Sequence, residues 1–345
     1  MLAESVLLPL LHSHRSLANT RQRCYVLIGG GIRLRPTRSR WWIEMGNGCM
    51  SLKTTYGPGK FALSFELFPP KTAGGETALF AHLVQLVKFG PAFITCTYGA
   101  GGSSRSKTLD IVQEVKRRFQ VPVASHLTCV GSSVDQLREY LTEASGSGVD
   151  HIVALRGDPP KGETEFCAAA GGLRYANELV ALIRAEFPRF GIAVAGYPEK
   201  HLEAPSFEAD LENLRRKVDA GADVVVTQLF YDNEDFFRFR DRCRQTGVHV
   251  PIVPGILPVT NLSQVQRITS MCGARLPKAF VEAFQAGADP VGQFQVGVDH
   301  AIRQVRELIQ QGVPGIHFFL LNKSQATSWV LAEVDLPRHA GCSGR

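Results

Sequence analysis

Polar side chains end seven short apolar runs of this sequence, and their types suit acid–base chemistry on a bound organic molecule. Glu66 is the first, closing the run FALSFEL before Pro69 and Pro70. A carboxyl group in a partly dry site has a raised pKa, so it can stay protonated near neutral pH and act as a general acid. The other runs end in hydroxyl, imidazole, amide and charged groups: Thr97, Tyr98, His126, Thr128, Arg156, Asp158, Tyr197, Gln228, Asn322 and Lys323.

The apolar runs alternate with amphipathic stretches from residue 61 onward. Continuous apolar strands separated by helices are typical of a parallel sheet that is buried on both faces. In residues 206–220, for example, Phe207, Leu211 and Leu214 recur at helical spacing. Eight such units in one domain predict an α/β fold, a closed (β/α)8 barrel of the TIM type. The expected strands are 61–67, 92–98, 121–128, 151–158, 191–198, 223–230, 250–257 and 315–321.

A barrel of this type gathers the residues that follow its strands at one mouth, where active sites form. Taken singly, Glu66 would more often be a solvated loop residue and His126 a core histidine. The repetition of polar groups at strand ends favours a site. On helix 206–220, Asp210, Asn213 and Lys217 share one face, which either holds hydroxyls and phosphates of a ligand or forms a solvated, salt-bridged surface.

Charge and cysteine usage limit the classes of partner. The net charge is +6, but residues 1–60 hold nine Lys and Arg against two acidic residues, so the rest of the chain is close to neutral. Nucleic acid is therefore not an expected partner, and no apolar run reaches the ~18 residues that would cross a membrane. The eight cysteines stand singly, without metal-binding spacing. We expect no metal and a cytoplasmic location.

Residues 1–59 form a basic extension without sustained periodicity, which is disordered, a weak targeting segment or the result of a misassigned start. The stretch CYVLIGGGIRLRP resembles a dinucleotide-binding turn, but Leu34 replaces the third glycine, and Arg35-Pro36 stops the helix that should follow. The expected division is therefore an extension at 1–59, a catalytic barrel at 60–335 and a tail at 336–345.

Nine motifs together resemble the methylenetetrahydrofolate reductases of the short bacterial type, and the similarity runs through residues 61–335. In chain order they are SFELFPPK, TYGAGG, HLTC, HIVALRGDPP, AGYPEKH, KVDAGAD, TQLFYD, PGILP and IHFFLLNK. The resemblance implies an FAD-containing barrel that reduces 5,10-methylenetetrahydrofolate to 5-methyltetrahydrofolate with NADH or NADPH, for methionine synthesis. It also suggests a homo-oligomer.

The resemblance further implies roles for individual residues. Glu66 would be the general acid, and Asp158 would contact the pterin and tune the flavin. Folate would be held by Glu66, Asp158, Gln228, Gln264 and Lys323. FAD would be held by Thr97, Tyr98, Ala100, His126, Arg156, Gly157, Asp158, Tyr175, Ala176, Tyr197, His201, Ala204, Asp210, Asn213, Arg216 and Lys217.

Two other functions are compatible with a barrel of this kind. One is a different flavin-dependent oxidoreductase resembling proline dehydrogenase, which would need a clamp of arginines for a carboxylate where the segment NKSQATSW offers one lysine. The other is a non-catalytic scaffold, against which the joint presence of Glu66, Asp158 and Gln228 argues. Nothing in the sequence distinguishes NADH from NADPH.

Overall fold

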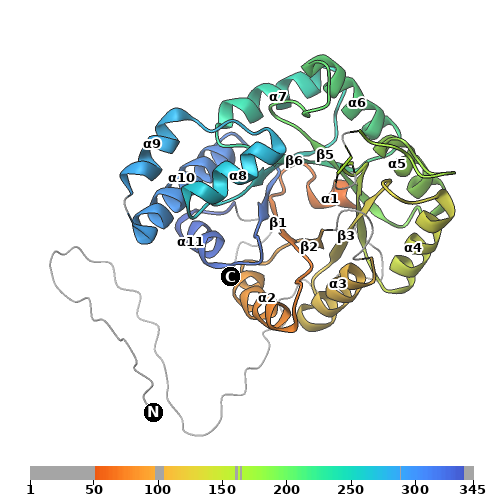
Figure 1. The fold of residues 1–345 in the computed structure, drawn as a ribbon, viewed down its shortest axis with the longest axis horizontal. Helices are drawn as coiled ribbons and strands as arrows, with labels where there is room; N and C mark the ends of the chain where they lie inside the picture. Colours follow the sequence, from red (N-terminus) through yellow and green to blue (C-terminus); the bar gives the residue numbers. More distant parts are fainter. Residues whose placement is uncertain (1–50, 98–104, 160–161, 164, 288, 338–345) are drawn as a thin grey trace, which may run out of the picture. The chain divides into compact units, whose positions relative to one another are not determined.

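A computed structural model describes residues 51–97, 105–159, 162–163, 165–287 and 289–337. The chain divides into two compact units, residues 1–48 and 49–345, and every described residue belongs to the second. Eight parallel strands in sequence order close into a barrel, which confirms the predicted fold class (Figure 1). The strands are β1 (Ala62–Leu67), β2 (Phe93–Cys96), β3 (Val123–Thr128), β4 (His151–Leu155), β5 (Gly191–Gly196), β6 (Val224–Leu229), β7 (Ile252–Ile256) and β8 (Gly315–Phe319).

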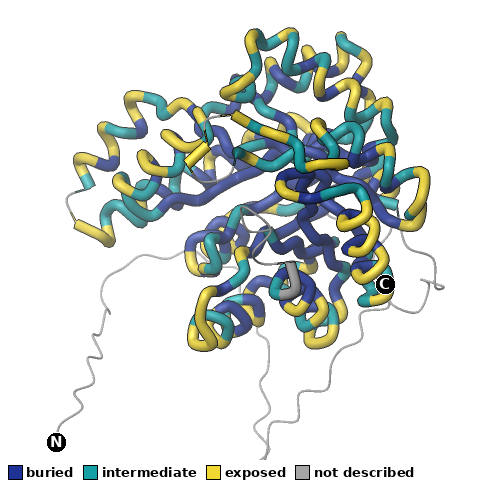
Figure 2. The backbone as a smooth tube through the Cα atoms, turned by 45° about the vertical axis from the view of Figure 1, so that its right-hand side comes forward, coloured by how far each residue is buried: buried dark blue, intermediate teal, exposed yellow. Residues whose placement is uncertain are grey.

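Helices connect the strands on the outside of the barrel, and their apolar faces pack against the sheet (Figure 2). The section between β7 and β8 contains three helices, and Pro277, which was predicted to break this section, caps the second of them. The helices are α2 (Ala73–Leu86) with the 3-10 turn η2 (Val87–Phe89), α3 (Arg105–Phe119), α4 (Val134–Gly146), α5 (Ala176–Glu186), α6 (Phe207–Asp219), α7 (Asn233–Gln245), α8 (Leu262–Cys272), α9 (Lys278–Ala286), α10 (Pro290–Gln310) and α11 (Gln325–Glu333).

A short helix, α1 (Leu52–Thr55), precedes the barrel and packs against its inner residues. Leu52 and Tyr56 are buried beside Phe93 and Ala193, which point into the barrel from β2 and β5. These residues lie toward the N-terminal ends of their strands, so α1 closes the bottom of the barrel. The sequence analysis placed this segment in the basic extension, and the structure makes it part of the barrel's core.

The first and last strands are joined beyond their backbone ladder by a side chain. Asn322 follows β8 in a left-handed conformation, as does Leu321. Its amide nitrogen donates to the Phe68 carbonyl at 2.8 Å, and its amide oxygen accepts from the Phe68 N–H at 2.9 Å. One amide side chain thus continues the pairing of β1 with β8 into the loops at the mouth.

We predict that a chain beginning at Met50 folds with the same stability as the full chain, because it keeps Leu52 and Tyr56. A chain beginning at Lys60 should be less stable, since burying one large apolar side chain contributes roughly 1.5–3 kcal/mol. Thermal unfolding of the three proteins, followed by circular dichroism, measures both differences. Equal midpoints for the two shortened chains would contradict the role assigned to α1.

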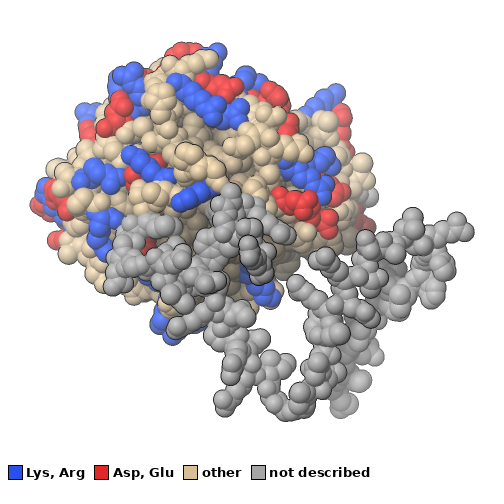
Figure 3. All heavy atoms as spheres, turned by 180° about the vertical axis from the view of Figure 1, so that it is seen from behind, with Lys and Arg blue, Asp and Glu red and all other residues tan. Residues whose placement is uncertain are grey.

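Lys, Arg, Asp and Glu are interspersed on the face shown in Figure 3, where basic and acidic side chains alternate. Many of these groups are paired along one helix, such as Arg117 and Arg118 with Glu114 on α3. In the part of the chain that the structure describes, no helix is long and apolar enough to span a membrane.

Candidate active site

Glu66 lies inside the barrel, near the C-terminal end of β1, and is only 7% exposed. Alternate residues of a barrel strand point inward. Because Ala62 of β1 and Ala124 of β3 belong to the inner layer, Glu66 and His126 point inward as well. The Glu66 carboxylate oxygen Oε2 lies 3.3 Å from His126 Nε2 and 3.4 Å from Nε2 of His317 on β8. Three strands therefore bring one carboxylate and two imidazoles into contact.

A chain of hydrogen bonds continues from His317 toward the bottom of the barrel. Its Nδ1 lies 2.8 Å from the hydroxyl oxygen of Ser64, which is aligned with it in the β1–β8 register. The Tyr56 hydroxyl donates to the same Ser64 oxygen at 3.0 Å. All of these side chains are buried.

The histidines reverse the expected pKa shift of Glu66. Burial by itself raises the pKa of this carboxyl, but the charge and hydrogen bonds of His126 and His317 outweigh burial and lower the pKa from 4.5 to about 2. The sequence analysis expected a raised pKa, and this expectation was wrong because it did not include the imidazole neighbours. In the ligand-free protein the carboxylate is ionised, and a proton in this cluster resides on an imidazole.

Two hydroxyl groups and one imidazole nitrogen at this end of the barrel lack hydrogen-bond partners among the described residues. They are Oγ1 of Thr95 on β2, Oγ1 of Thr128 on β3 and Nε2 of His126, whose contact with Glu66 is an ion pair without hydrogen-bond geometry. Buried polar atoms are costly when unpaired. This side of the mouth therefore offers polar groups that a ligand can satisfy.

Arg156, which follows β4, lies beside a cavity of about 360 Å³. Its guanidinium binds the Glu203 carboxylate through two hydrogen bonds of 2.7 and 2.6 Å, and it lies 4.9 Å from the centre of the Phe166 ring. Tyr175 also lines the cavity. The next residue, Gly157, has a φ of +87°, and a Cβ there would lie 2.6 Å from Val130 Cγ1, so this turn requires glycine.

A second group of predicted residues converges between β5 and α6. The Tyr197 and His201 rings meet edge to face at 4.6 Å, and the Asp210 carboxylate accepts from the His201 backbone N–H at 2.9 Å. The Lys217 ammonium donates to the Ala195 carbonyl at 2.6 Å. Burial lowers the pKa of Lys217 from 10.5 to about 8, and Asp210 partly opposes this shift. These four residues form a connected cluster at the mouth.

The residues expected to hold folate are more dispersed. Asp158 is exposed in the turn after β4, and Lys323 is exposed after β8. The Gln228 side chain on β6 turns back, and its amide oxygen accepts from the Leu229 N–H at 2.9 Å. Gln264 lies in the first turn of α8, where its backbone N–H is capped by Asn261. In this state they form no cluster comparable with Glu66 and its histidines.

The remaining predicted cofactor residues have varied surroundings. Thr97 directly follows β2, and Ala176 and Ala204 lie in the segments that lead into α5 and α6. Asn213 is exposed on α6, and Arg216 is exposed there in an ion pair with Glu212 at 3.5 Å. Tyr98 and Ala100 lie outside the described residues.

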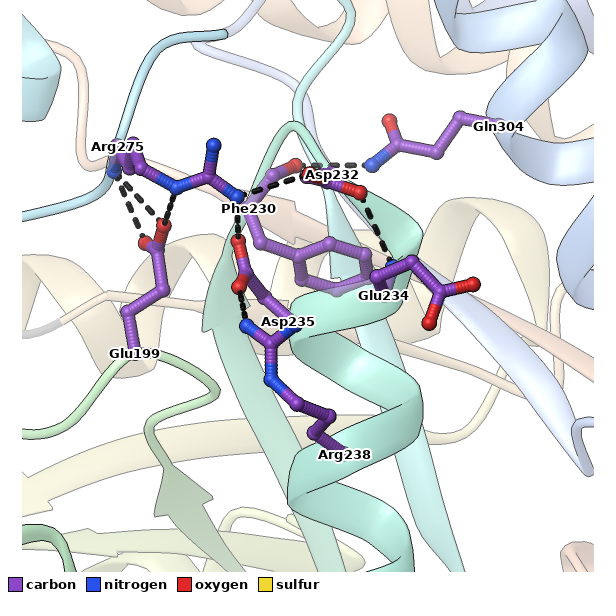
Figure 4. Close-up of polar contacts among 8 residues, drawn as sticks. All are labelled: Glu199, Phe230, Asp232, Glu234, Asp235, Arg238, Arg275 and Gln304. Atoms are coloured by element: carbon purple, nitrogen blue, oxygen red, sulfur yellow. Dashed lines mark hydrogen bonds and ion pairs between the residues drawn. The ribbon is translucent and has the colours of Figure 1, made fainter.

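Arg275 fastens the α8–α9 segment to the barrel (Figure 4). Its backbone N–H donates to both Glu199 carboxylate oxygens at 2.9 and 3.0 Å, and its guanidinium donates to Asp232 at 2.8 Å and Asp235 at 2.9 Å. Asp235 also pairs with Arg238. Burial raises the pKa of Glu199 to about 7, and nearby Asp235 adds to the shift. This network fixes the position of α8, which carries Gln264.

Sequence reasoning missed Ser64, His317 and Tyr56. The signal for Ser64 and His317 was available, because each is a polar residue within an apolar strand, and Ser64 stands two positions before Glu66 on the same face. Nothing local marked Tyr56, because its contact with Ser64 depends on how α1 closes the barrel.

The sequence matches the methylenetetrahydrofolate reductase family profile over residues 52–335. It is 42% identical over 270 residues to the 5,10-methylenetetrahydrofolate reductase of Pectobacterium carotovorum, covering 77% of this chain and 88% of that protein. The enzyme of Escherichia coli (strain K12) is 41% identical over 271 residues, with the same coverage of each chain.

Two further comparisons extend this picture. Methylenetetrahydrofolate reductase (NADH) 1 of Arabidopsis thaliana is 36% identical over 296 residues, covering 83% of this chain and half of the plant protein. An uncharacterised protein from Clostridium thermocellum that binds two copies of 5-methyl-5,6,7,8-tetrahydrofolic acid has a similar fold, with a TM-score of 0.55, 14% identity and coverage of 82% of this chain and 98% of that one. With a family match across the whole barrel and two bacterial relatives above 40% identity, the chain belongs to the methylenetetrahydrofolate reductase family of oxidoreductases.

Proposed function

We propose that this enzyme reduces 5,10-methylenetetrahydrofolate to 5-methyltetrahydrofolate, using FAD and NADH or NADPH, and so supplies methyl groups for methionine synthesis. The observation that carries the proposal is the contact of Glu66 with His126 and His317 inside the barrel. Family membership supports the folate substrate, and the NADH-type names of the plant relatives support a nicotinamide donor.

Proton delivery is the task that this cluster suits. The five-membered ring of the substrate must open before its one-carbon unit can accept a hydride, and the nitrogen released by opening needs a proton. Because Glu66 is ionised in the ligand-free protein, we infer that the proton is held jointly by the carboxylate and an imidazole. Folate binding would displace water from the mouth, raise the pKa of Glu66 and let it protonate the nitrogen.

The polar residues around this cluster would bind the folate. Gln228 can offer an amide donor and acceptor to the pterin edge after it releases the Leu229 N–H. Asp158 would contact the pterin, while Gln264 and Lys323 would hold the rest of the substrate from α8 and the β8 end. Arg275 supports this assignment indirectly, because it fixes the helix that carries Gln264.

The surroundings of β3 to α6 fit FAD. A dinucleotide needs cations for its phosphates and polar partners for its hydroxyls, and Arg156, Lys217 and Asp210 supply them beside a cavity of about 360 Å³. The unpaired Thr128 hydroxyl is a further available partner. When bound, FAD supplies hydride transfer, which no protein side chain can perform.

The direct test is a two-stage reaction with the purified protein. It should carry flavin absorbance, which NADH or NADPH bleaches and 5,10-methylenetetrahydrofolate restores, with 5-methyltetrahydrofolate as product. Running each nicotinamide separately identifies the donor. A proline-dehydrogenase-like enzyme would instead be bleached by proline, and a colourless protein that binds no added FAD would exclude a flavoenzyme.

The lowered pKa of Lys217 predicts a pH dependence of FAD affinity. Below its pKa of about 8 the ammonium attracts the anionic cofactor, and above that pH the ligand-free lysine must gain a proton when FAD binds. The dissociation constant should therefore rise with pH above 8, by up to about tenfold per pH unit.

Fluorescence titration of the flavin-free protein with FAD between pH 7 and 10 measures this slope. The Lys217→Met variant should bind more weakly at pH 7 and lose the slope that begins near pH 8. Arg215→Met provides the control, because Arg215 is an exposed cation on the same helix, paired with Asp219. An unchanged slope in Lys217→Met would remove the lysine from the cofactor site.

A further inference from the structure

The hydrogen-bond chain behind Glu66 ends on a residue that stands outside the barrel strands. Tyr56 follows α1 and is 2% exposed. Its hydroxyl reaches Ser64, Ser64 reaches His317, and His317 reaches Glu66, at 3.0, 2.8 and 3.4 Å. The chain thus links the bottom closure of the barrel to the carboxylate near its mouth.

The hydrogen bonds in this chain can run in two directions. When His317 is neutral, Tyr56 donates to Ser64, Ser64 donates to Nδ1, and the imidazole proton on Nε2 faces Glu66. When His317 is protonated, Nδ1–H donates to Ser64, and the Ser64 hydroxyl must turn toward another acceptor. The Tyr56 oxygen lies at hydrogen-bond distance for that role. Burial raises the pKa of Tyr56, so its hydroxyl stays neutral in both arrangements.

Other titratable groups also face Glu66. His126 contacts it from β3, and the pKa of the Cys96 thiol on β2 is raised by burial and by the Glu66 charge, which keeps the thiol neutral. Of the two histidines, His317 has the ring nitrogen opposite Glu66 bonded to a buried hydroxyl. Its protonated state is therefore the one that a more distant residue can stabilise.

We propose that Tyr56 is a positioning residue for proton delivery, which sets the direction of the Ser64 hydroxyl and thereby stabilises protonated His317 beside Glu66. The inference rests on the proposed folate reduction. The proton that reaches the folate nitrogen leaves the Glu66–His317 pair, which regains one from solvent, while Tyr56 keeps its own. Through Tyr56, helix α1 contributes to the reactivity of the site as well as to the closure of the barrel.

The test is Tyr56→Phe, which keeps the ring in its buried place and removes only the hydroxyl. In this variant the Ser64 hydroxyl loses its acceptor when His317 is protonated, and a buried unpaired group of this kind disfavours that state. Folate-dependent reoxidation of the flavin should slow by roughly tenfold near neutral pH, and its decline with rising pH should begin at a lower pH. Flavin reduction by the nicotinamide should keep the wild-type rate and pH profile.

Tyr140→Phe is the matched control, because Tyr140 and Ser125 form another buried contact between hydroxyl groups, at 2.5 Å, on the outside of the same barrel. It should leave the pH profile of reoxidation unchanged. Ser64→Ala interrupts the chain at its middle and should reproduce the shift. Adding Tyr56→Phe to Ser64→Ala should then change nothing further, since coupled residues are not additive.

The outcomes separate this inference from the proposed function. If the wild-type protein is not reoxidised by 5,10-methylenetetrahydrofolate, the proposed function fails and the inference fails with it. If the wild type reacts and Tyr56→Phe keeps its pH profile, the function stands and the positioning role is wrong. Additive effects of Tyr56→Phe and Ser64→Ala, or equal slowing of both half-reactions, would mean that Tyr56 supports only the fold.

Discussion

Replacing Glu66 by glutamine is expected to slow the reduction of 5,10-methylenetetrahydrofolate by ~10²–10⁴-fold, the usual effect of losing a general acid. Glutamine keeps the size of the side chain and can still hydrogen-bond to His126 and His317, but it cannot release a proton to the folate nitrogen. Flavin reduction by NADH or NADPH needs no such proton, so it should proceed at close to the wild-type rate.

Stopped-flow absorbance of the two half-reactions measures this separation, with a quinone as a foreign acceptor that should still reoxidise the flavin. If both half-reactions slow equally, Glu66 positions the cofactor. If neither slows, the proton comes from another group, and His126 becomes the first candidate because it contacts the same carboxylate.

The same substitution has a consequence for stability in acid. Because the pKa of Glu66 is lowered from 4.5 to about 2, the ionised carboxylate stabilises the fold above pH 4.5, and this contribution is lost as the pH falls toward 2. Glu66→Gln removes that dependence. Denaturant unfolding at pH 5 and pH 3.5 should therefore show a smaller acid loss in the variant than in the wild type.

Removing the buried Asp223 carboxylate at the other end of the barrel is expected to lower the free energy of unfolding by ~3–5 kcal/mol. Asp223 immediately precedes β6 and is 5% exposed. It accepts from the Ile192 N–H of β5 at 2.8 Å and from the Arg184 guanidinium at 3.0 Å. In Asp223→Ala, the strand N–H and the arginine both lose this partner.

Urea unfolding of Asp223→Ala measures this effect, and Asp150→Ala is its control. Asp150 precedes β4 and accepts from the Val123 N–H of β3 at 2.9 Å and from Lys116 at 2.8 Å. Its side chain is 23% exposed against 6% for Asp223, so its removal should cost less. Both variants should keep normal half-reaction rates while folded, because the bottom of a TIM barrel serves stability. A larger loss in Asp150→Ala would contradict the dependence on burial.

The strands could be predicted from the sequence because each is a continuous apolar run that ends in a polar residue. Every expected strand contains the observed one, with β4, for example, ending at Leu155 rather than at Asp158. Glu66 could be identified by the same logic, since strand alternation and barrel closure place the C-terminal end of β1 at the mouth. Local pattern was sufficient for these features.

The neighbours of Glu66 could not be derived in the same way. His317 lies 251 residues away in sequence, and its contact with Glu66 arises from the register of β8 with β1. Without those partners, the sequence suggested a carboxyl whose burial raises its pKa, whereas the assembled site lowers it. The pairing of Arg156 with Glu203 likewise depends on how two loops meet at the mouth.

The clasp between Asn322 and Phe68 has a consequence for how the mouth can be redesigned. Because one side chain satisfies both the N–H and the carbonyl of Phe68, the loops after β1 and β8 are a single mechanical unit, although they lie at opposite ends of the sequence. Grafting either loop from a relative without the other would leave backbone groups unmatched across the seam. Recombination that exchanges the β1 and β8 loops together would keep them matched, so chimaeras are best assembled with these two segments from the same parent.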